Sequence, residues 1–360
     1  MIMDKVRVGV VGVGALAQEA HLPSYGRRQD VEVVAFADPE VARVQAAAEK
    51  FAKEHSKPVP IVYASIDDMI AAQGSNLDAV SICTPNVWHV PLALKALDAG
   101  YHVLLEKPMA TKVEEARQLA ERVKATGKVL MVGMSHRYRE DVEALKRFID
   151  SGELGDIYYA KTRILRRRGT PKGWFTDMST SGGGPLMDIG VHALDLTWWL
   201  LGQPEPSRVS GYLHQGIGND GVSFIHTWTA KSAPNQDNAI YDTEDFASAM
   251  VRFASGTALQ LEVSWSLNGP EDDALKVEIF GSRGGVSLDP LRIFSTSHHV
   301  LTQTSLPVGM GPFFKRELDH FIDCVKAGET PISDVQQGLE VVRMLEGIAT
   351  SSAHGAEVSI

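Results

Sequence analysis

The sequence predicts two domains of different architecture: an N-terminal α/β domain built on a doubly wound parallel sheet, and a C-terminal α+β domain with a large, mostly antiparallel, open-faced sheet. The chain has 360 residues, more than one hydrophobic core usually serves. Up to about residue 134 short apolar runs alternate with amphipathic segments, whereas after residue 155 longer stretches alternate between apolar and polar residues. We therefore assign residues 1–134 to the first domain and residues 135–360 to the second.

In the first domain the apolar runs are uninterrupted, which is typical of parallel strands that helices cover on both faces. The expected strands are Val6–Val11, Val31–Phe36, Ala79–Cys83, His102–Leu105 and Val129–Val132. Segments with helical spacing separate these strands, among them Val41–Lys53, Val90–Ala99 and Val113–Thr126.

In the second domain the alternation of apolar and polar residues predicts strands with one buried face, separated by turns such as Ala254-Ser255-Gly256 and residues 281–285. The expected strands are Ile157–Leu165, Ser207–His214, Ser223–Thr229, Phe246–Phe253, Ala258–Ser266 and Leu275–Phe280. One helix, Met187–Leu201, interrupts the series and is stopped by Gly202 and Pro204. Helices near Phe313–Ala327 and Val335–Ala353 close the chain.

Composition and charge exclude several classes of protein. Hydrophobic residues make up 44% and charged residues 22% of the chain, as in ordinary globular proteins. The formal net charge of -10 repels nucleic-acid phosphates unless a basic patch is strongly segregated. The one tight basic run, Arg166 to Arg168, suits a single anionic group rather than a DNA-binding face. We therefore expect no nucleic-acid partner.

Cysteine content and apolar runs indicate the compartment. Cys83 and Cys324 lie far apart in the sequence, which predicts no disulfide framework and favours a reducing compartment. No apolar run approaches the roughly 18 to 20 residues that a membrane helix needs. Glycines interrupt the apolar segment Val6–Leu16, so we interpret it as a strand and a turn rather than a targeting signal. We expect a cytoplasmic protein with no membrane contact.

The first predicted strand runs into a glycine turn with the pattern G-x-G-x-x-A at residues 12–17, which opens a predicted helix. Gly12 permits a tight turn, Gly14 lets the backbone approach a pyrophosphate, and Ala17 allows close packing of helix and strand. The free N–H groups of the helix N-terminus then face the phosphates. The alternative is a purely structural turn. The turn residues expected to contact a dinucleotide in this Rossmann-type site are Gly12, Gly14, Ala15 and Leu16.

Asp38 follows the second predicted strand. A carboxylate at this position can accept hydrogen bonds from both ribose hydroxyl groups and would repel a 2′-phosphate. We therefore expect NAD rather than NADP as the cofactor. The alternative is that Asp38 only caps the next helix.

Polar residues follow two further strands, at the edge of a doubly wound sheet where ligands bind. A lysine beside the nicotinamide can hydrogen-bond a substrate hydroxyl and favour its alkoxide-like transition state. Pro108, which fixes the backbone after this lysine, is a candidate for a cis bond. A simple loop and a surface tripeptide are the alternatives. The residues expected to line the cofactor crevice are Thr84, Pro85, Asn86, His89, Glu106 and Lys107.

A second cluster of chemically active residues lies on the predicted helix that starts at Met187. In a regular helix Asp188 and His192 stand four residues apart on one face, and Gly190 leaves the helix thin between them. An imidazole titrates near neutral pH and can take and return a proton. The alternative is a core histidine. No third ligand has convincing spacing, so we predict no metal site.

The order and spacing of these motifs resemble one family. The glycine turn, Thr84-Pro85-Asn86, Glu106-Lys107-Pro108 and the run from Gly182 through Asp188 and His192 to Asp195 look like the Gfo/Idh/MocA oxidoreductases, and the resemblance covers essentially the whole chain. One segment departs from the family pattern, Ser135-His136-Arg137-Tyr138, and its contact with cofactor or substrate stays open.

The resemblance implies a role for three residues. His192 would be the general base that takes the hydroxyl proton from a secondary alcohol carbon of a sugar or polyol. Lys107 would polarise and orient that oxygen, and Asp188 would position the substrate or tune the histidine. Hydride would then pass to the nicotinamide.

Substrate contacts are expected from the second domain as well as from Lys107, Asp188 and His192. An aromatic ring under a sugar face, with guanidinium groups at its hydroxyls, makes a plausible pocket. Trp174 with Arg166 and Arg168 could supply it. The alternative is a solvated strand end with one core tryptophan.

Three functions are compatible with these residues. The first is an NAD-dependent sugar or polyol dehydrogenase. The second is an enzyme that retains NAD and cleaves a glycosidic bond through transient sugar oxidation and elimination. The third is a non-catalytic sugar and NAD sensor, which the presence of all three catalytic residues disfavours. The open sheet face predicts a homodimer or homotetramer, and the sequence does not identify the sugar, the oxidised carbon or the direction of reaction.

Overall fold

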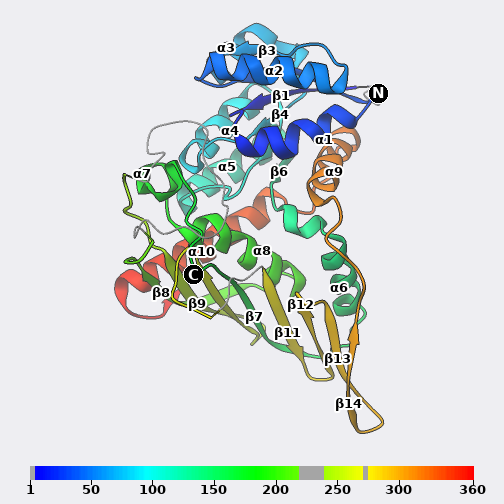
Figure 1. Cartoon of the computed structure of the whole chain (residues 1–360), viewed down its shortest axis with the longest axis vertical. Helices are drawn as coiled ribbons and strands as arrows, with labels where there is room; N and C mark the ends of the chain where they lie inside the picture. The colour runs from blue at the N-terminus through cyan, green and yellow to red at the C-terminus, as the bar shows by residue number, and fades with distance from the viewer. Residues whose placement is uncertain (1–4, 219–238, 271–274) are drawn as a thin grey trace.

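The computed structural model describes residues 5–218, 239–270 and 275–360. They form two units stacked along the long axis of the molecule, each built on one sheet (Figure 1). Within the described ranges no helix is long and apolar enough to cross a membrane. Cys83 and Cys324 are both free.

The first sheet has six parallel strands in the order β3-β2-β1-β4-β5-β6. The order reverses between β1 and β4, and this reversal creates the crevice where doubly wound sheets bind ligands. The predicted parallel sheet is confirmed. The strands are β1 Val6–Val11, β2 Val31–Ala37, β3 Ile61–Tyr63, β4 Ala79–Ile82, β5 His102–Leu105 and β6 Leu130–Val132.

Helices cover both faces of this sheet (Figure 1). The predicted helix after the glycine turn starts as a π-helix and continues as α1. The helical elements are η1 Ala17–His21, α1 Leu22–Arg27, α2 Val41–His55, α3 Ile66–Gln73, η2 Gly74–Asn76, η3 Asn86–Trp88, α4 His89–Asp98 and α5 Val113–Thr126.

The second sheet has nine strands in the order β14-β13-β12-β11-β7-β10-β9-β8-β15. Only β7 and β10 run parallel; the other neighbours are antiparallel. The predicted strand Ser223–Thr229 lies outside the described residues. The strands are β7 Ile157–Leu165, β8 Pro206–His214, β9 Phe246–Phe253, β10 Ala258–Ser264, β11 Lys276–Gly281, β12 Gly284–Leu288, β13 Arg292–Ser297, β14 Val300–Ser305 and β15 Val358–Ser359.

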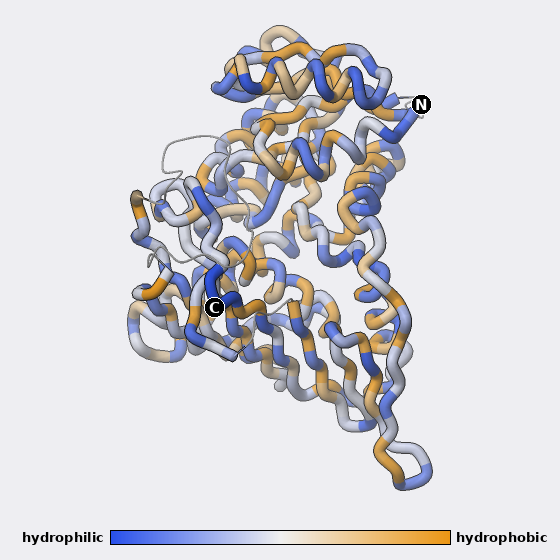
Figure 2. The backbone as a smooth tube through the Cα atoms, in the orientation of Figure 1, coloured by the Kyte–Doolittle hydropathy of each residue, from blue (hydrophilic) through white to orange (hydrophobic). Residues whose placement is uncertain are grey.

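One face of the second sheet carries helices α6, α8 and α10, while the other face is open, as predicted (Figure 1). Along β11, for example, Val277 and Ile279 are buried while Lys276 and Glu278 face outward. Figure 2 shows the same alternation of hydrophobic and hydrophilic residues along these strands. The helical elements of this unit are η4 Ser135–Tyr138, α6 Glu140–Asp150, η5 Trp174–Thr176, α7 Met178–Ser181, η6 Leu186–Gly190, α8 Val191–Leu200, α9 Phe313–Ala327 and α10 Val335–His354.

Helix α9 returns to the first unit although it follows the second sheet in sequence. Its residues Leu318 and Phe321 are fully buried in the same core as Val6 and Tyr25, and α9 lies beside α1 in Figure 1. The two units are therefore joined by packed side chains as well as by the chain itself.

Candidate active site

The glycine turn has the shape that a bound pyrophosphate requires. Gly12 has a φ of +81°, and a Cβ there would lie 2.8 Å from the carbonyl oxygen of Cys83 and from Cγ2 of Thr84. A Cβ on Gly14 would meet no atom within 4 Å, so the backbone at Gly14 borders open space. Ala17 is fully buried where the helix starts. These residues fit a dinucleotide, with the phosphates against Gly14 and the start of the helix.

Asp38 is buried beside the turn and is already hydrogen-bonded. Its Oδ2 accepts from the backbone N–H of Val13 at 2.9 Å, and its Oδ1 accepts from that of Glu40 at 2.9 Å. Arg43 donates to both oxygens at 3.1 Å and to the carbonyl of Val13 at 2.9 Å. The bond from Glu40 resembles the expected capping alternative, but the bond from Val13 ties Asp38 to the phosphate-binding turn. Arg43 was not anticipated from the sequence.

The Thr84-Pro85-Asn86 loop is held against two neighbouring segments. Asn86 donates its side-chain amide to the carbonyl of Ser181 at 2.7 Å. The His89 ring lies between two carbonyls, with Nδ1 2.7 Å from Pro108 and Nε2 2.9 Å from Thr84. Because both ring nitrogens are engaged inside the protein, we expect His89 to brace these loops rather than to contact the cofactor. Oγ1 of Thr84, in contrast, is buried without a partner among the described residues.

Glu106 is buried against the first turn of the N-terminal helix. Its Oε1 lies 2.9 Å from Nε2 of His21, and its Oε2 accepts from the backbone N–H of Lys107 at 3.3 Å. Burial alone would raise the pKa of Glu106, but His21 and nearby positive charge hold that pKa below its ordinary value. Glu317 of α9 is fully buried nearby, and burial together with Glu106 raises its pKa. The pKa values of these two neighbouring carboxyl groups are therefore shifted in opposite directions.

Lys107 and Asp188 meet where the two units face each other. The ammonium of Lys107 donates to the backbone carbonyl of Asp188 at 2.8 Å and to its Oδ1 at 3.0 Å. The indole of Trp265, which is fully buried, donates to the other carboxylate oxygen at 3.1 Å. The bond between Lys107 and Pro108 is cis, as the sequence allowed. Trp265 is a site residue that sequence reasoning missed.

The helix that carries Asp188 and His192 is not regular. Residues Leu186–Gly190 form a π-helix, and α8 starts only at Val191. The two side chains are not hydrogen-bonded: the Asp188 carboxylate bonds Lys107 and Trp265, and Nδ1 of His192 is buried without a described partner. The structure therefore shows no direct bond by which Asp188 could tune His192, and the role of Asp188 in positioning the substrate stays a prediction.

Other neighbours set the protonation of His192. Burial lowers its pKa well below the ordinary value of a histidine, and Lys107, His136 and Arg166 lower it further. The His136 ring stands edge-on to the His192 ring, with centroids 4.7 Å apart at 89°. The lowered pKa favours the neutral form of His192, and His136 belongs to the segment whose role the sequence left open.

Arg137 of the same segment is tied to helix α8. Arg137 is buried and donates its Nε to Oδ2 of Asp195 at 2.9 Å, with a second bond from Nη2 to Oδ1. Its guanidinium also lies over the Trp199 ring. Asp195, the last residue of the motif on the catalytic helix, therefore anchors that helix rather than contacting a substrate.

The expected substrate residues of the second domain are only partly brought together. Arg166 acts on the pKa of His192 and so lies near it. Arg168 donates to the carbonyl of Leu267 at 3.2 Å and to Oδ1 of Asn268 at 3.0 Å. Trp174 stacks on Phe175 with centroids 4.1 Å apart, and both rings are half-buried. Within the described ranges no cluster of three or more metal-ligating side chains occurs.

Comparison with known proteins identifies both units. Residues 6–134 match the model of an oxidoreductase family with an NAD-binding Rossmann fold, and residues 142–287 match the GFO/IDH/MocA C-terminal domain. D-glucoside 3-dehydrogenase of Escherichia coli K12 is 32% identical over 100% of this chain and 99% of its own length. The scyllo-inositol 2-dehydrogenase (NAD(+)) of Bacillus subtilis is 29% identical, over 91% of this chain and 88% of its own length.

Solved structures share the fold. The aldose-aldose oxidoreductase from Caulobacter crescentus superimposes with a TM-score of 0.80 at 23% identity, covering 99% of this chain and 100% of that one. The match of residues 6–134 to the NAD-binding family model confirms the predicted NAD-binding Rossmann fold.

Proposed function

The chain belongs to the Gfo/Idh/MocA oxidoreductase family, and from this premise we propose that it is an NAD-dependent dehydrogenase that oxidises a secondary alcohol carbon of a sugar or cyclic polyol. One observation carries the proposal. Lys107, which follows β5, pairs with the Asp188 carboxylate at 3.0 Å and lies close enough to His192 on α8 to lower its pKa, at the edge of the sheet where the glycine turn opens. Bound NAD would supply the acceptor for the hydride that leaves the alcohol carbon.

Lys107 is prepared to hold a substrate oxygen. An ammonium has three N–H donors, and Asp188 takes two of them through its carbonyl and Oδ1. The third is left for the substrate hydroxyl, where a fixed positive charge favours the alkoxide-like transition state. Asp188 therefore serves to aim Lys107, and Trp265 fixes Asp188 from the other side.

His192 is prepared to take the hydroxyl proton. Its pKa lies well below 6.5, so the ring is unprotonated at neutral pH and can act as a general base. Nδ1 is buried, which leaves Nε2 as the nitrogen that faces a substrate. Arg166 and the ring of Trp174 remain our proposed contacts for the rest of the sugar.

The names of the relatives point to a substrate class to test first. One is a dehydrogenase for position 3 of D-glucosides and the other acts on scyllo-inositol, and both substrates are six-membered rings with equatorial secondary hydroxyl groups. We propose D-glucosides first, because that relative matches the whole chain. The comparisons favour a dehydrogenase over the glycoside-cleaving alternative.

The test is a substrate screen that follows the absorbance of NADH over glucosides, inositols, free hexoses and uronic acids. NADH that accumulates in proportion to oxidised sugar supports the proposal. Cleavage of a glycoside with NAD present in far smaller amounts than the substrate, and without accumulation of NADH, would instead establish the alternative mechanism.

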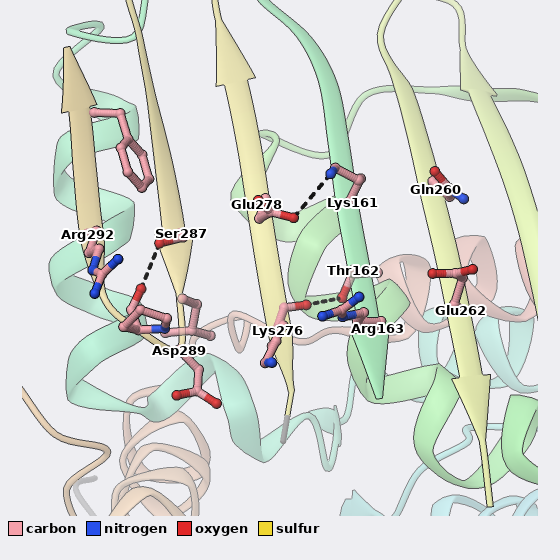
Figure 3. A pocket seen from close by; sticks show the side chains of 13 residues that line it. Lys161, Thr162, Arg163, Gln260, Glu262, Lys276, Glu278, Ser287, Asp289 and Arg292 are labelled. Atoms are coloured by element: carbon pink, nitrogen blue, oxygen red, sulfur yellow. Dashed lines mark hydrogen bonds and ion pairs between the residues drawn. The ribbon is translucent and has the colours of Figure 1, made fainter. Parts of the chain in front are cut away.

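We further propose that residues 1–134 bind the cofactor, that residues 135–360 supply substrate contacts, and that the open face of the second sheet mediates self-association. Outward side chains of both signs line a hollow of about 390 Å³ on this face (Figure 3), and Lys161 pairs with Glu278 across it at 3.3 Å. Mixed charge of this kind can complement a second copy. Light scattering would show a dimer or tetramer, and Lys161→Glu should weaken it; a monomer at all concentrations would contradict the proposal.

The free cysteines and NAD chemistry suit the cytoplasm.

A further inference from the structure

His136 has no role in the mechanism above, yet it is the closest aromatic neighbour of the proposed base. Its ring meets that of His192 edge to face, with centroids 4.7 Å apart at 89°. On its other side it stacks on Phe313 of α9, with centroids 5.8 Å apart at 16°. His136 thus contacts both the start of α9 and helix α8, which carries His192.

The Nδ1 atoms of the His136 and His192 rings make no conventional hydrogen bond to the described residues. Nδ1 of His136 and Nδ1 of His192 are both buried, and neither has a partner among the described residues. An unpartnered buried N–H is costly, but an edge-to-face ring pair accommodates a ring N–H or C–H against an aromatic face. The pair therefore fixes the orientation of His192 without giving its ring a hydrogen-bond acceptor.

We propose that His136 is a positioning residue for the catalytic base: it packs edge-on against His192, fixes the ring and excludes water and hydrogen-bond acceptors from its buried side. This inference rests on the proposed function, in which His192 takes the substrate proton. It assigns a role to the segment Ser135–Tyr138, in which Arg137 anchors α8 through Asp195 and His136 contacts the base.

The charged groups around His192 agree with this role. Lys107 after β5 and Arg166 after β7 place positive charge near the ring, while the carboxylate of Asp188 in η6 is held by Lys107. On its own helix, Asp195 is paired with Arg137. No carboxylate in the described structure is therefore bonded to the ring, and an imidazolium there is poorly stabilised.

The groups around His136 keep it neutral as well. Burial lowers the pKa of His136 to about 3, and Arg139 and Lys107 lower it while Asp141 opposes them. Arg139 and Asp141 are themselves paired at 2.7 Å. His136 consequently contributes bulk and an aromatic surface, and no charge, across the working pH range of a dehydrogenase.

Two replacements of similar volume test the inference. His136→Gln supplies an amide oxygen that can accept a hydrogen bond from Nδ1 of His192 and so stabilise the imidazolium. His136→Phe keeps an aromatic ring with no acceptor. A group that stabilises the imidazolium of His192 raises its pKa. We therefore expect the His192 pKa to rise by about one unit or more in the Gln variant and to stay low in the Phe variant. His320→Ala is the matched control, because His320 packs on Tyr138 of the same segment but not on His192.

Two readouts separate this inference from the proposed function. NMR titration of the His192 ring, assigned with His192→Gln, measures the pKa directly. The acid limb of kcat/KM measures its effect on turnover, and kcat in the Gln variant should fall about tenfold at a pH below both values, since one pKa unit changes the unprotonated fraction tenfold. Melting temperature and NAD affinity should change little in either variant.

An unchanged His192 pKa in His136→Gln, or an equal rise in His136→Phe and His320→Ala, would overturn the positioning role. If the NMR titration shifts as expected while the acid limb does not move, His136 does position His192, and it is the assignment of His192 as the base that fails. If both move together, both hold.

Discussion

Arg43 makes the cofactor preference a property of two residues rather than of Asp38 alone. In the structure Arg43 donates to both carboxylate oxygens of Asp38 and to the carbonyl of Val13, so its guanidinium sits where a 2′-phosphate on the ribose would arrive. Asp38→Ser removes the repelling carboxylate and at the same time releases Arg43. We therefore expect this variant to bind NADP more tightly, with Arg43 as the new partner of the phosphate.

The size of the effect follows from the contacts. A hydrogen bond to a charged group contributes about 1.5–3 kcal/mol, which is roughly 10- to 150-fold in affinity. Asp38→Ser should lose affinity for NAD by an amount in this range, because the ribose loses a charged acceptor. It should gain a similar factor for NADP, but only while Arg43 is present, since Arg–phosphate pairs are strong and bidentate.

A double-mutant cycle measures this coupling. Dissociation constants for NAD and NADP are determined by fluorescence for the unmodified protein, Asp38→Ser, Arg43→Gln and the double variant. The gain for NADP should appear in Asp38→Ser and be largely lost in the double variant. An equal gain in both backgrounds would refute the role of Arg43, and tighter binding of NADP than of NAD by the unmodified protein would refute the placement of Asp38.

Three other changes test the site and its surroundings. Lys107→Ala should lower turnover by about 10²-fold or more, because it removes the charge that stabilises the transition state. NAD affinity measured by fluorescence should change far less. Unchanged turnover would show that Lys107 has no part in the mechanism. Trp265→Phe keeps an aromatic ring but leaves one oxygen of Asp188 without the indole donor, so kcat should fall about tenfold while NAD affinity stays intact. Equal rates for both proteins in steady-state kinetics would show that Asp188 needs no such support. Glu317→Gln should become more stable than the unmodified protein as pH rises. Burial raises the folded-state pKa of Glu317, so the stability that its neutral form contributes is complete below the unfolded-state pKa and is lost as pH rises from that value through the folded-state pKa. The loss is at most about 1.4 kcal/mol per pH unit. Urea unfolding at a series of pH values with no divergence of the two proteins would contradict that assignment.

The strands of the first domain were predictable because burial on both faces leaves uninterrupted apolar runs in the sequence. β3 was not, since Ile61–Tyr63 is three residues long and partly exposed. In the second sheet, residues 281–285 were interpreted as a turn, yet Gly284 already starts β12. The hairpin of β13 and β14 was missed because much of it is exposed, so no buried face shows in its sequence.

Within the site, the residues with motif spacing were found and their partners were not. Lys107, Asp188 and His192 follow from local patterns, but their hydrogen bonds depend on tertiary contacts. Trp265 reaches Asp188 from β10's end, 77 residues away in sequence, and no local pattern marks it. His136 lies in the segment Ser135–Tyr138, and the departure of this segment from the family pattern was the only sign in the sequence that marked it. The i, i+4 spacing of Asp188 and His192 could not show that the Asp188 carboxylate bonds Lys107 and Trp265, because these partners come from distant segments.

The most direct test of the central claim is the pH–rate profile of His192→Gln beside that of the unmodified enzyme, measured with thermal melts on the same samples. In the unmodified enzyme the rate of alcohol oxidation should rise with pH through one ionisation whose midpoint lies below 6.5, because burial and neighbouring positive charge lower the pKa of His192. The variant should fold, bind NAD and lose most of its activity, and the remaining activity should lack that acid limb. A variant with a lower melting temperature but full turnover per folded molecule would show His192 to be a core residue, and the proposed mechanism would be wrong.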